Sequence, residues 1–195
     1  MKTTSKILTV LAVMTFGTQA FASNPDDMTT KLLDYWKGHA GSNAQTPEPL
    51  PAELAMIFDY SQLTDSAIEP HKGQFNATQL GRYKEIFSDL LKRTVHTRAG
   101  AAIGKTDYQV SKSKKVKGVR EVKVSAYIPE EDINTDVVFV WEQHSVGWQV
   151  IDVRIDDASL VTDYRNQFGR LINKEGVDGF LSKLERKLEK TSGNG

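Results

Sequence analysis

The stretch from residue 148 to residue 181 constrains the fold of this chain more than any other part of the sequence. Residues 148–155 are rich in β-branched and other apolar side chains, which is typical of a strand. A short run containing aspartate follows, and residues 158–173 and 177–190 then show helical spacing on either side of Gly176. Glycine is common at helix ends because it adopts left-handed backbone conformations without strain. The stretch therefore predicts a strand, a turn and two consecutive helices.

The part of the chain before this stretch changes its apolar period from helical to strand-like. Residues 76–95 carry one apolar stripe at helical spacing, and Asn76 with Gln79 forms a variant of the capping box. Beyond Gly104 the period becomes two, and we predict four strands at residues 107–111, 119–128, 136–144 and 148–155. The alternation favours an antiparallel sheet with helices on one face. We therefore expect an α+β fold, with an antiparallel sheet of about four strands (NTF2- or cystatin-like) packed with an α-helical subdomain.

The N-terminus has the pattern of a cleavable export signal. Lys2 and Lys6 precede a short apolar segment at residues 7–16, and Ala20 and Ala22 form an A-x-A cleavage site. Ten helical residues reach about 15 Å, which is half of a ~30 Å hydrocarbon core. We expect cleavage after Ala22 and a mature protein outside the cytoplasm.

The remaining chain divides by composition. Residues 23–51 are predicted as a short helix followed by a flexible linker, because residues 38–51 contain three prolines and two glycines. Residues 52–190 are predicted as the main α+β domain, and residues 191–195 as a disordered tail.

Composition and motifs exclude several functions. Basic and acidic residues are equal in number, 25 of each, which argues against a nucleic-acid-binding protein. The chain has no cysteine, and its histidines lack the spacing of a metal site. Residues 100–106 are similar to a phosphate-binding loop, but a helix precedes them and a strand follows, which is the reverse of the required order. No cofactor is expected.

Acidic residues cluster at the end of the last predicted strand. Asp152, Asp156 and Asp157 could supply a paired-carboxylate site, and a small hydrolase that uses Asp152 and a histidine is one alternative. Aspartate is also common in turns and helix caps for backbone reasons. We favour Asp157 as a helix cap and Asp152 as a structural hydrogen-bond acceptor, paired with Arg165.

The only marked charge run lies between residues 112 and 123. Its basic residues could attract anionic lipid headgroups or an acidic partner surface if they lie on a hairpin. A solvated hairpin whose lysines discourage edge pairing is the alternative, and the sequence favours it. The run comprises Lys112, Lys114, Lys115, Lys117, Arg120 and Lys123.

The C-terminal stretch carries a set of residues that matches a known family pattern: Trp148, Val150, Asp152, Val153, Ser159, Leu160, Val161, Tyr164, Arg165, Gln167, Phe168, Gly176, Phe180 and Leu181. With these residues the stretch resembles the MlaC-type periplasmic phospholipid-binding proteins, the toluene-tolerance auxiliary family of ABC lipid transport. The likeness is most specific between residues 148 and 180 and weaker upstream. Thr94-Val95 and Asp157 depart from the family pattern.

The resemblance implies a periplasmic carrier that holds phospholipid acyl chains in an apolar pocket between sheet and helices. It implies an inner-membrane ABC transporter with an MCE-domain ring and an outer-membrane lipoprotein complex as partners, and we expect a monomer. The alternative is a secreted NTF2- or cystatin-like module for another apolar ligand, such as a hopanoid or a solvent. The residues predicted to line the pocket are Leu90, Leu91, Val138, Val140, Trp148, Val150, Val153, Leu160, Tyr164 and Phe168.

Overall fold

The structure is a computed structural model that describes residues 24–39 and 51–191. The predicted signal peptide (1–22), nearly all of the predicted linker and residues 192–195 of the predicted tail lie outside the described residues.

A single antiparallel sheet forms the strand-rich half of the chain. Its order is β1-β3-β4-β5-β6. Strand β2 pairs with residues 119–121 of β3, and β1 pairs with residues 124–127 of the same strand. The predicted α+β fold is confirmed, and the four predicted strands correspond to β1, β3, β4 and β5. The pattern did not mark β2 and β6, which are only 3 and 2 residues long. The strands are β1 (Asp107–Val110), β2 (Lys114–Val116), β3 (Val119–Ile128), β4 (Ile133–His144), β5 (Gly147–Ile155) and β6 (Ala158–Ser159).

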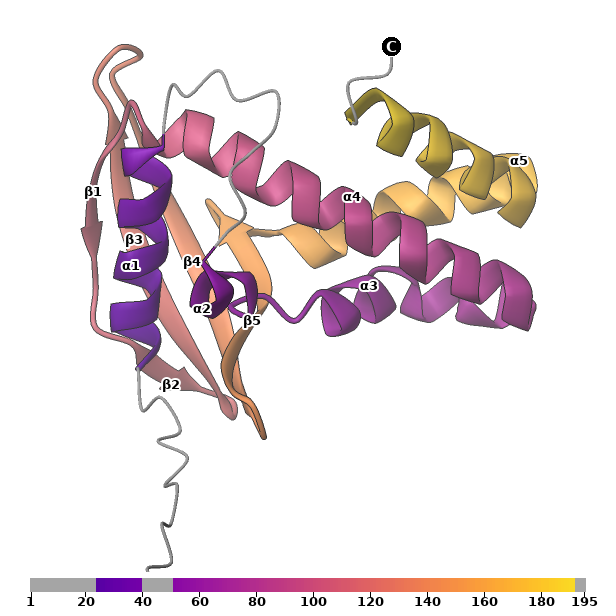
Figure 1. Cartoon of the computed structure of the whole chain (residues 1–195), viewed down its shortest axis with the longest axis horizontal. Coiled ribbons are helices and arrows are strands. Elements are labelled where there is room, and N and C mark those ends of the chain that lie inside the picture. Colours follow the sequence, from indigo (N-terminus) through magenta and orange to yellow (C-terminus); the bar gives the residue numbers. More distant parts are fainter. Residues whose placement is uncertain (1–23, 40–50, 192–195) are drawn as a thin grey trace, which may run out of the picture.

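The helices form one layer over the sheet and a subdomain beside it (Figure 1). Helix α1 lies over β1 and β3, and α4 runs from the sheet to the subdomain that it forms with α3 and α5. The elements are α1 (Pro25–Gly38), α2 (Ala52–Ala55), α3 (Tyr60–Ile68), the 3-10 helix η1 (Glu69–Gln74), α4 (Ala77–Ile103) and α5 (Leu160–Thr191).

Local sequence signals explain where the two long helices begin and bend. The Gln79 backbone N–H donates to Asn76 Oδ1 at 2.9 Å, and the Asn76 N–H donates to Gln79 Oε1 at 3.0 Å, which is the predicted capping box at the start of α4. The two predicted C-terminal helices form α5, in which Gly176 (φ 69°, ψ 175°) interrupts the helical backbone. The predicted break at Gly176 is therefore present.

One apolar core joins the helices to the sheet. Helix α1 contributes Leu32, Leu33 and Trp36, which are 0%, 1% and 4% exposed, to the same cluster as the sheet and α4. The sequence pattern placed this helix with the linker, outside the main domain at residues 52–190. In the structure it packs as part of the core.

Candidate functional site

An irregularity in the pairing of β4 and β5 determines which side chains face the helices. Val153 pairs with Phe139 and Val150 pairs with Trp141, because the register shifts between Val140 and Trp141. Residues three apart on a regular strand point to opposite faces. The shift therefore brings Val150 and Val153 to the same face as Phe139 and Trp141.

The predicted residues of the sheet fall on both of its faces. Trp148, Val150 and Val153 belong to the apolar core or pack against it. Val138 pairs with Lys123 and Arg154, and Val140 pairs with Glu121 and Asp152, so these two valines lie on the opposite face. The five predicted sheet residues therefore do not share one face. The apolar run around Val138 fits either face, and only the register selects Phe139 and Trp141 for the core.

An ion pair covers the two valines on the opposite face. Arg154 on β5 and Glu121 on β3 flank β4, and their charged ends are 2.7 Å apart. The pair therefore passes over β4, where Val138 and Val140 are the side chains that point to this face. This explains why Val140 is only 8% exposed although it does not belong to the core cluster.

The predicted residues of the helices lie in or beside an aromatic cluster. Leu90 and Leu91 of α4 are buried, and Tyr164 and Phe168 of α5 pack around Phe87, with ring centroids 5.0 and 4.9 Å away. Leu160, at the start of α5, is half-buried. The structure therefore joins Leu90, Leu91, Tyr164 and Phe168 to the same core as the helix-facing side of β5.

The core also contains residues that the sequence analysis did not select. Phe139 and Trp141 occupy the helix-facing positions on β4, and Tyr83 and Phe87 are central to the aromatic cluster. The sequence shows that these residues are apolar. It does not show whether Val138 or Phe139 faces the helices, because that depends on the strand register. The indole Nε1 of Trp141 is buried and has no hydrogen-bond partner within residues 24–39 and 51–191.

Asp152 has a structural role where the sheet meets α5. Its carboxylate accepts hydrogen bonds from the N–H groups of Val153 (2.9 Å) and Val161 (3.1 Å) and from Ser159 Oγ (2.6 Å). Asp152 is thus the structural acceptor that the sequence indicated. Arg165, which was predicted to pair with Asp152, instead donates to the Ser66 carbonyl from both Nε (3.2 Å) and Nη2 (3.0 Å).

The helix cap at the start of α5 also differs from the prediction. The Thr162 N–H donates to Ser159 Oγ at 3.1 Å, so Ser159 caps the helix. Asp157 instead occupies a turn position with φ 68°, a left-handed conformation that aspartate tolerates better than most residues.

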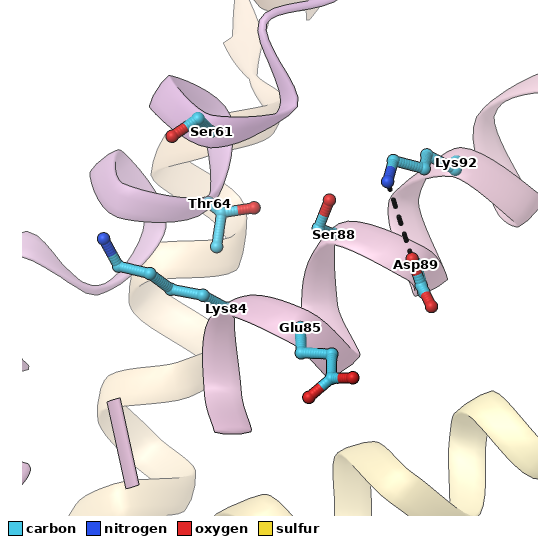
Figure 2. A pocket seen from close by; sticks show the side chains of 7 residues that line it. All are labelled: Ser61, Thr64, Lys84, Glu85, Ser88, Asp89 and Lys92. Atoms are coloured by element: carbon cyan, nitrogen blue, oxygen red, sulfur yellow. Dashed lines mark ion pairs between the residues drawn. The ribbon is translucent and has the colours of Figure 1, made fainter. Parts of the chain in front are cut away.

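None of the predicted residues lines either of two surface cavities. One, of about 350 Å³, lies between α3 and α4 and has a polar lining that includes Thr64, Lys84 and Asp89 (Figure 2). The other, of about 450 Å³, lies over β1, β3 and β4 and is lined in part by Asp107 and Asp136. Neither lining suits an apolar chain, and the space between sheet and helices is occupied by core side chains such as Trp141 and Leu90.

Three tyrosines that belong to the core or pack against it have raised pKa values. Burial raises the pKa of Tyr60 and, together with the charge of Asp65, that of Tyr83, well above the usual range. Burial and the hydrogen bond to Asp34 raise the pKa of Tyr108 to about 12. Among the described residues, no group of three or more histidine, aspartate or glutamate side chains is placed to hold a metal ion.

Comparison with known proteins identifies one family over most of the chain. A family model described as "MlaC protein" matches residues 26–186. The match includes α1, which agrees with the packing of this helix in the core. Within the described part of the chain, no helix combines the length and the apolar character needed to cross a membrane.

A solved structure has a similar fold. It is a phospholipid-binding protein from Ralstonia solanacearum, determined in complex with a phospholipid. The TM-score is 0.67 with 16% sequence identity, and the match covers 87% of this chain and 99% of that chain. At this identity the likeness shows the fold.

Proposed function

We propose a function from one premise: this chain belongs to the MlaC family. We propose that it binds phospholipid and carries it between the inner and outer membranes across the periplasm. Family membership supports the proposal, and so does the phospholipid in the Ralstonia solanacearum protein of similar fold. No reaction is required of such a carrier, and the carboxylate of Asp152 is engaged in structural hydrogen bonds.

A lipid carrier must replace the burial that a membrane gives to acyl chains. Each CH₂ group removed from water contributes about 0.8 kcal/mol, so exposing one long acyl chain costs on the order of 10 kcal/mol. A soluble protein offsets this cost with apolar side chains on both walls of a pocket. The helix-facing side of the sheet and the facing sides of α4 and α5 have this character.

The acyl chains are proposed to lie between the helix-facing side of the sheet and the two long helices. Val138 and Val140 were also predicted to line this pocket, but they point away from it. Trp141 adds a buried indole N–H, and an ester oxygen of a bound lipid would supply the acceptor that it lacks. The proposed lining comprises Leu90, Leu91, Trp148, Val150, Val153, Leu160, Tyr164 and Phe168, with Trp141 between the layers.

Binding requires a conformational change, because this space is filled by packed side chains. Interiors at crystal-like density have no room for an added chain. We propose that the sheet and the helices move apart as the lipid enters. Slower backbone hydrogen exchange in α4 and β5 of the lipid-bound protein would support this opening and closing.

The predicted export signal and the family support a proposal for the cellular setting. The proposed location is the periplasm, and the proposed partners are an inner-membrane ABC transporter with an MCE-domain ring and an outer-membrane lipoprotein complex. Fluorescent phospholipid transfer from donor to acceptor vesicles, with and without the protein, tests the carrier activity directly.

Native mass spectrometry of protein purified from the periplasm of its host is the decisive test. The expected result is an added mass that lipid extraction identifies as a glycerophospholipid with two acyl chains. A different apolar mass, such as a hopanoid, would instead identify a binding module for that ligand. Protein that stays empty after incubation with phospholipid vesicles would contradict the proposal.

A further inference from the structure

The sheet carries a concentrated positive surface at one end. Residues 112–123 contain six basic residues and one acidic residue, although the whole chain has equal numbers of each. The structure places these residues on β2, β3 and the segments that join them to one another and to β1. We call Lys112, Lys114, Lys115 and Lys117 the basic hairpin.

The four lysines of the basic hairpin are exposed and unpaired. Within residues 24–39 and 51–191, no carboxylate forms an ion pair with any of them. Neighbouring charges are paired, since Lys123 is 2.6 Å from Asp136 and Glu121 is 2.7 Å from Arg154. Among the described lysines of the sheet, those without an ion pair thus lie together at one edge.

The basic hairpin is held in a fixed position. Lys117 (φ 46°) and Gly118 (φ 96°) form its tight turn, a pair of left-handed conformations typical of two-residue hairpin turns. The Ser113 N–H donates to Asp26 Oδ1 of α1 at 2.8 Å, and Arg120 donates to Ser113 Oγ at 3.1 Å. The lysines are therefore presented by a braced element.

Apolar side chains lie at the same end of the sheet. Because β3 and β4 are antiparallel, the start of β3 lies beside the end of β4, which brings the basic hairpin and the turn between β4 and β5 to one end (Figure 1). Val146 in that turn is 63% exposed. Trp148 follows it, half-buried, with the Arg120 guanidinium 5.7 Å from its ring centroid. Cationic, aromatic and apolar side chains together are typical of a surface that rests on a membrane.

We propose that this end of the sheet docks on a membrane surface that carries anionic lipids. The lysines contact headgroups, and Val146 and the edge of Trp148 reach the boundary with the acyl chains. Charge alone would fit an acidic protein equally well, but the exposed valine and the amphipathic tryptophan favour a lipid interface. Each lysine near an anionic surface contributes roughly a fivefold increase in partitioning. Four lysines support a weak attachment, which high salt concentrations should abolish by screening the charges.

Flotation with vesicles tests the proposal. The purified protein is mixed with phosphatidylcholine vesicles, with or without phosphatidylglycerol, at low and at high salt. We expect flotation only with phosphatidylglycerol and at low salt. The variant Lys112→Gln/Lys114→Gln/Lys115→Gln should partition about 100-fold less, since three such contributions are removed. Lys117 is left in place because of its positive φ. Val146→Ser should give a smaller loss.

The matched control removes the same charge elsewhere. Lys174, Lys187 and Lys190 on α5 are exposed, and they too have no ion pair within the described residues. Their triple substitution by glutamine should leave flotation unchanged. Equal losses in both triple variants, or equal flotation with both kinds of vesicle, would overturn the proposal. A third result would also overturn the proposal: the parent protein does not float with any vesicle but binds a purified acidic protein, and the hairpin variant loses that binding. Vesicle binding is measured independently of cargo, so its failure leaves the proposed carrier function standing.

Discussion

Val138 on β4 and Val153 on β5 lie on opposite faces of one sheet, although both are half-buried valines in neighbouring strands. Val153 pairs with Phe139 and faces the helices, whereas Val138 lies between the positions of Lys123 and Arg154. The two positions therefore offer a comparison in which residue type and burial class are matched and only the face differs.

Val153→Glu should abolish phospholipid binding, and Val138→Glu should not. A carboxylate at residue 153 would enter the apolar space proposed for the acyl chains, where an unpaired charge is strongly disfavoured. A carboxylate at residue 138 would have Lys123 and Arg154 as neighbours across the strands. Lipid that co-purifies with each variant is measured by native mass spectrometry, and circular dichroism checks the fold.

A second variant keeps the test informative if Val153→Glu does not fold. Val153→Trp keeps the position apolar but fills space, so lipid occupancy should fall while the fold is retained. Lipid bound normally to a folded Val153→Glu protein would show that the pocket lies elsewhere. Lipid lost only from Val138→Glu would place it on the opposite face.

Trp141→Phe should weaken lipid binding while leaving the stability of the empty protein nearly unchanged. The buried indole N–H has no partner within the described residues, so its removal breaks no hydrogen bond and offsets the loss of apolar area. A hydrogen bond to a lipid ester would contribute about 1 kcal/mol, which corresponds to roughly a fivefold change in the dissociation constant. Urea unfolding and lipid titration measure the two effects. An unchanged dissociation constant would rule out this contact.

The fold was predictable from sequence where local chemistry decides it. The capping box at Asn76, the interruption at Gly176 and the four main strands follow from side-chain preferences within a few residues. The short strands β2 and β6 are too brief to show a period. They form because β3 and β5 provide an edge to pair with.

The site was only partly predictable, because it depends on long-range register. Residues 137–141 are apolar on both faces, so alternation could not decide between Val138 and Phe139. The shift that places Val150 and Val153 on one face is a property of two strands together. The packing of α1 against the sheet and α4 depends on contacts between segments far apart in the sequence, which no local pattern encodes.

Asp152→Ala should be strongly destabilising. Its carboxylate accepts three hydrogen bonds where β5, β6 and α5 meet, and removing it leaves the Val161 N–H at the start of α5 without this acceptor. We expect a loss of about 3 kcal/mol in the free energy of unfolding, measured in urea. Glu189→Ala, at an exposed position near the end of α5, should change stability by less than about 0.5 kcal/mol. Enzymatic turnover lost without a change in stability would instead assign Asp152 a chemical role.

The protein should lose stability at alkaline pH through its buried tyrosines. Burial raises the pKa of Tyr83, whose hydroxyl donates to the Thr64 carbonyl at 2.9 Å. The folded state therefore holds this proton more tightly than the unfolded state. The contribution is complete below the ordinary tyrosine value of about 10 and is lost as the pH rises toward the raised folded-state pKa, by about 1.4 kcal/mol per pH unit.

Urea unfolding at a series of alkaline pH values measures this slope, and tyrosinate absorbance shows whether ionisation accompanies unfolding. Tyr83→Phe should reduce the slope. Tyrosinate that forms at Tyr83 in the folded protein near the ordinary pKa would contradict the burial argument.

Gly169→Ala should destabilise the protein through one defined contact. A Cβ at residue 169 would lie 2.4 Å from His71 Nε2, so η1 and α5 could not keep their present distance unless the imidazole moved. The expected cost is about 1–2 kcal/mol. His71→Ala removes the obstructing ring, so Gly169→Ala should cost much less in that background, and a double-mutant cycle measures the difference. Gly81→Ala is the matched control, because this helical glycine of α4 has open space around its Cβ position and should gain about 0.5–1 kcal/mol. Equal costs for Gly169→Ala with and without the His71 ring would show that another contact sets the spacing of η1 and α5.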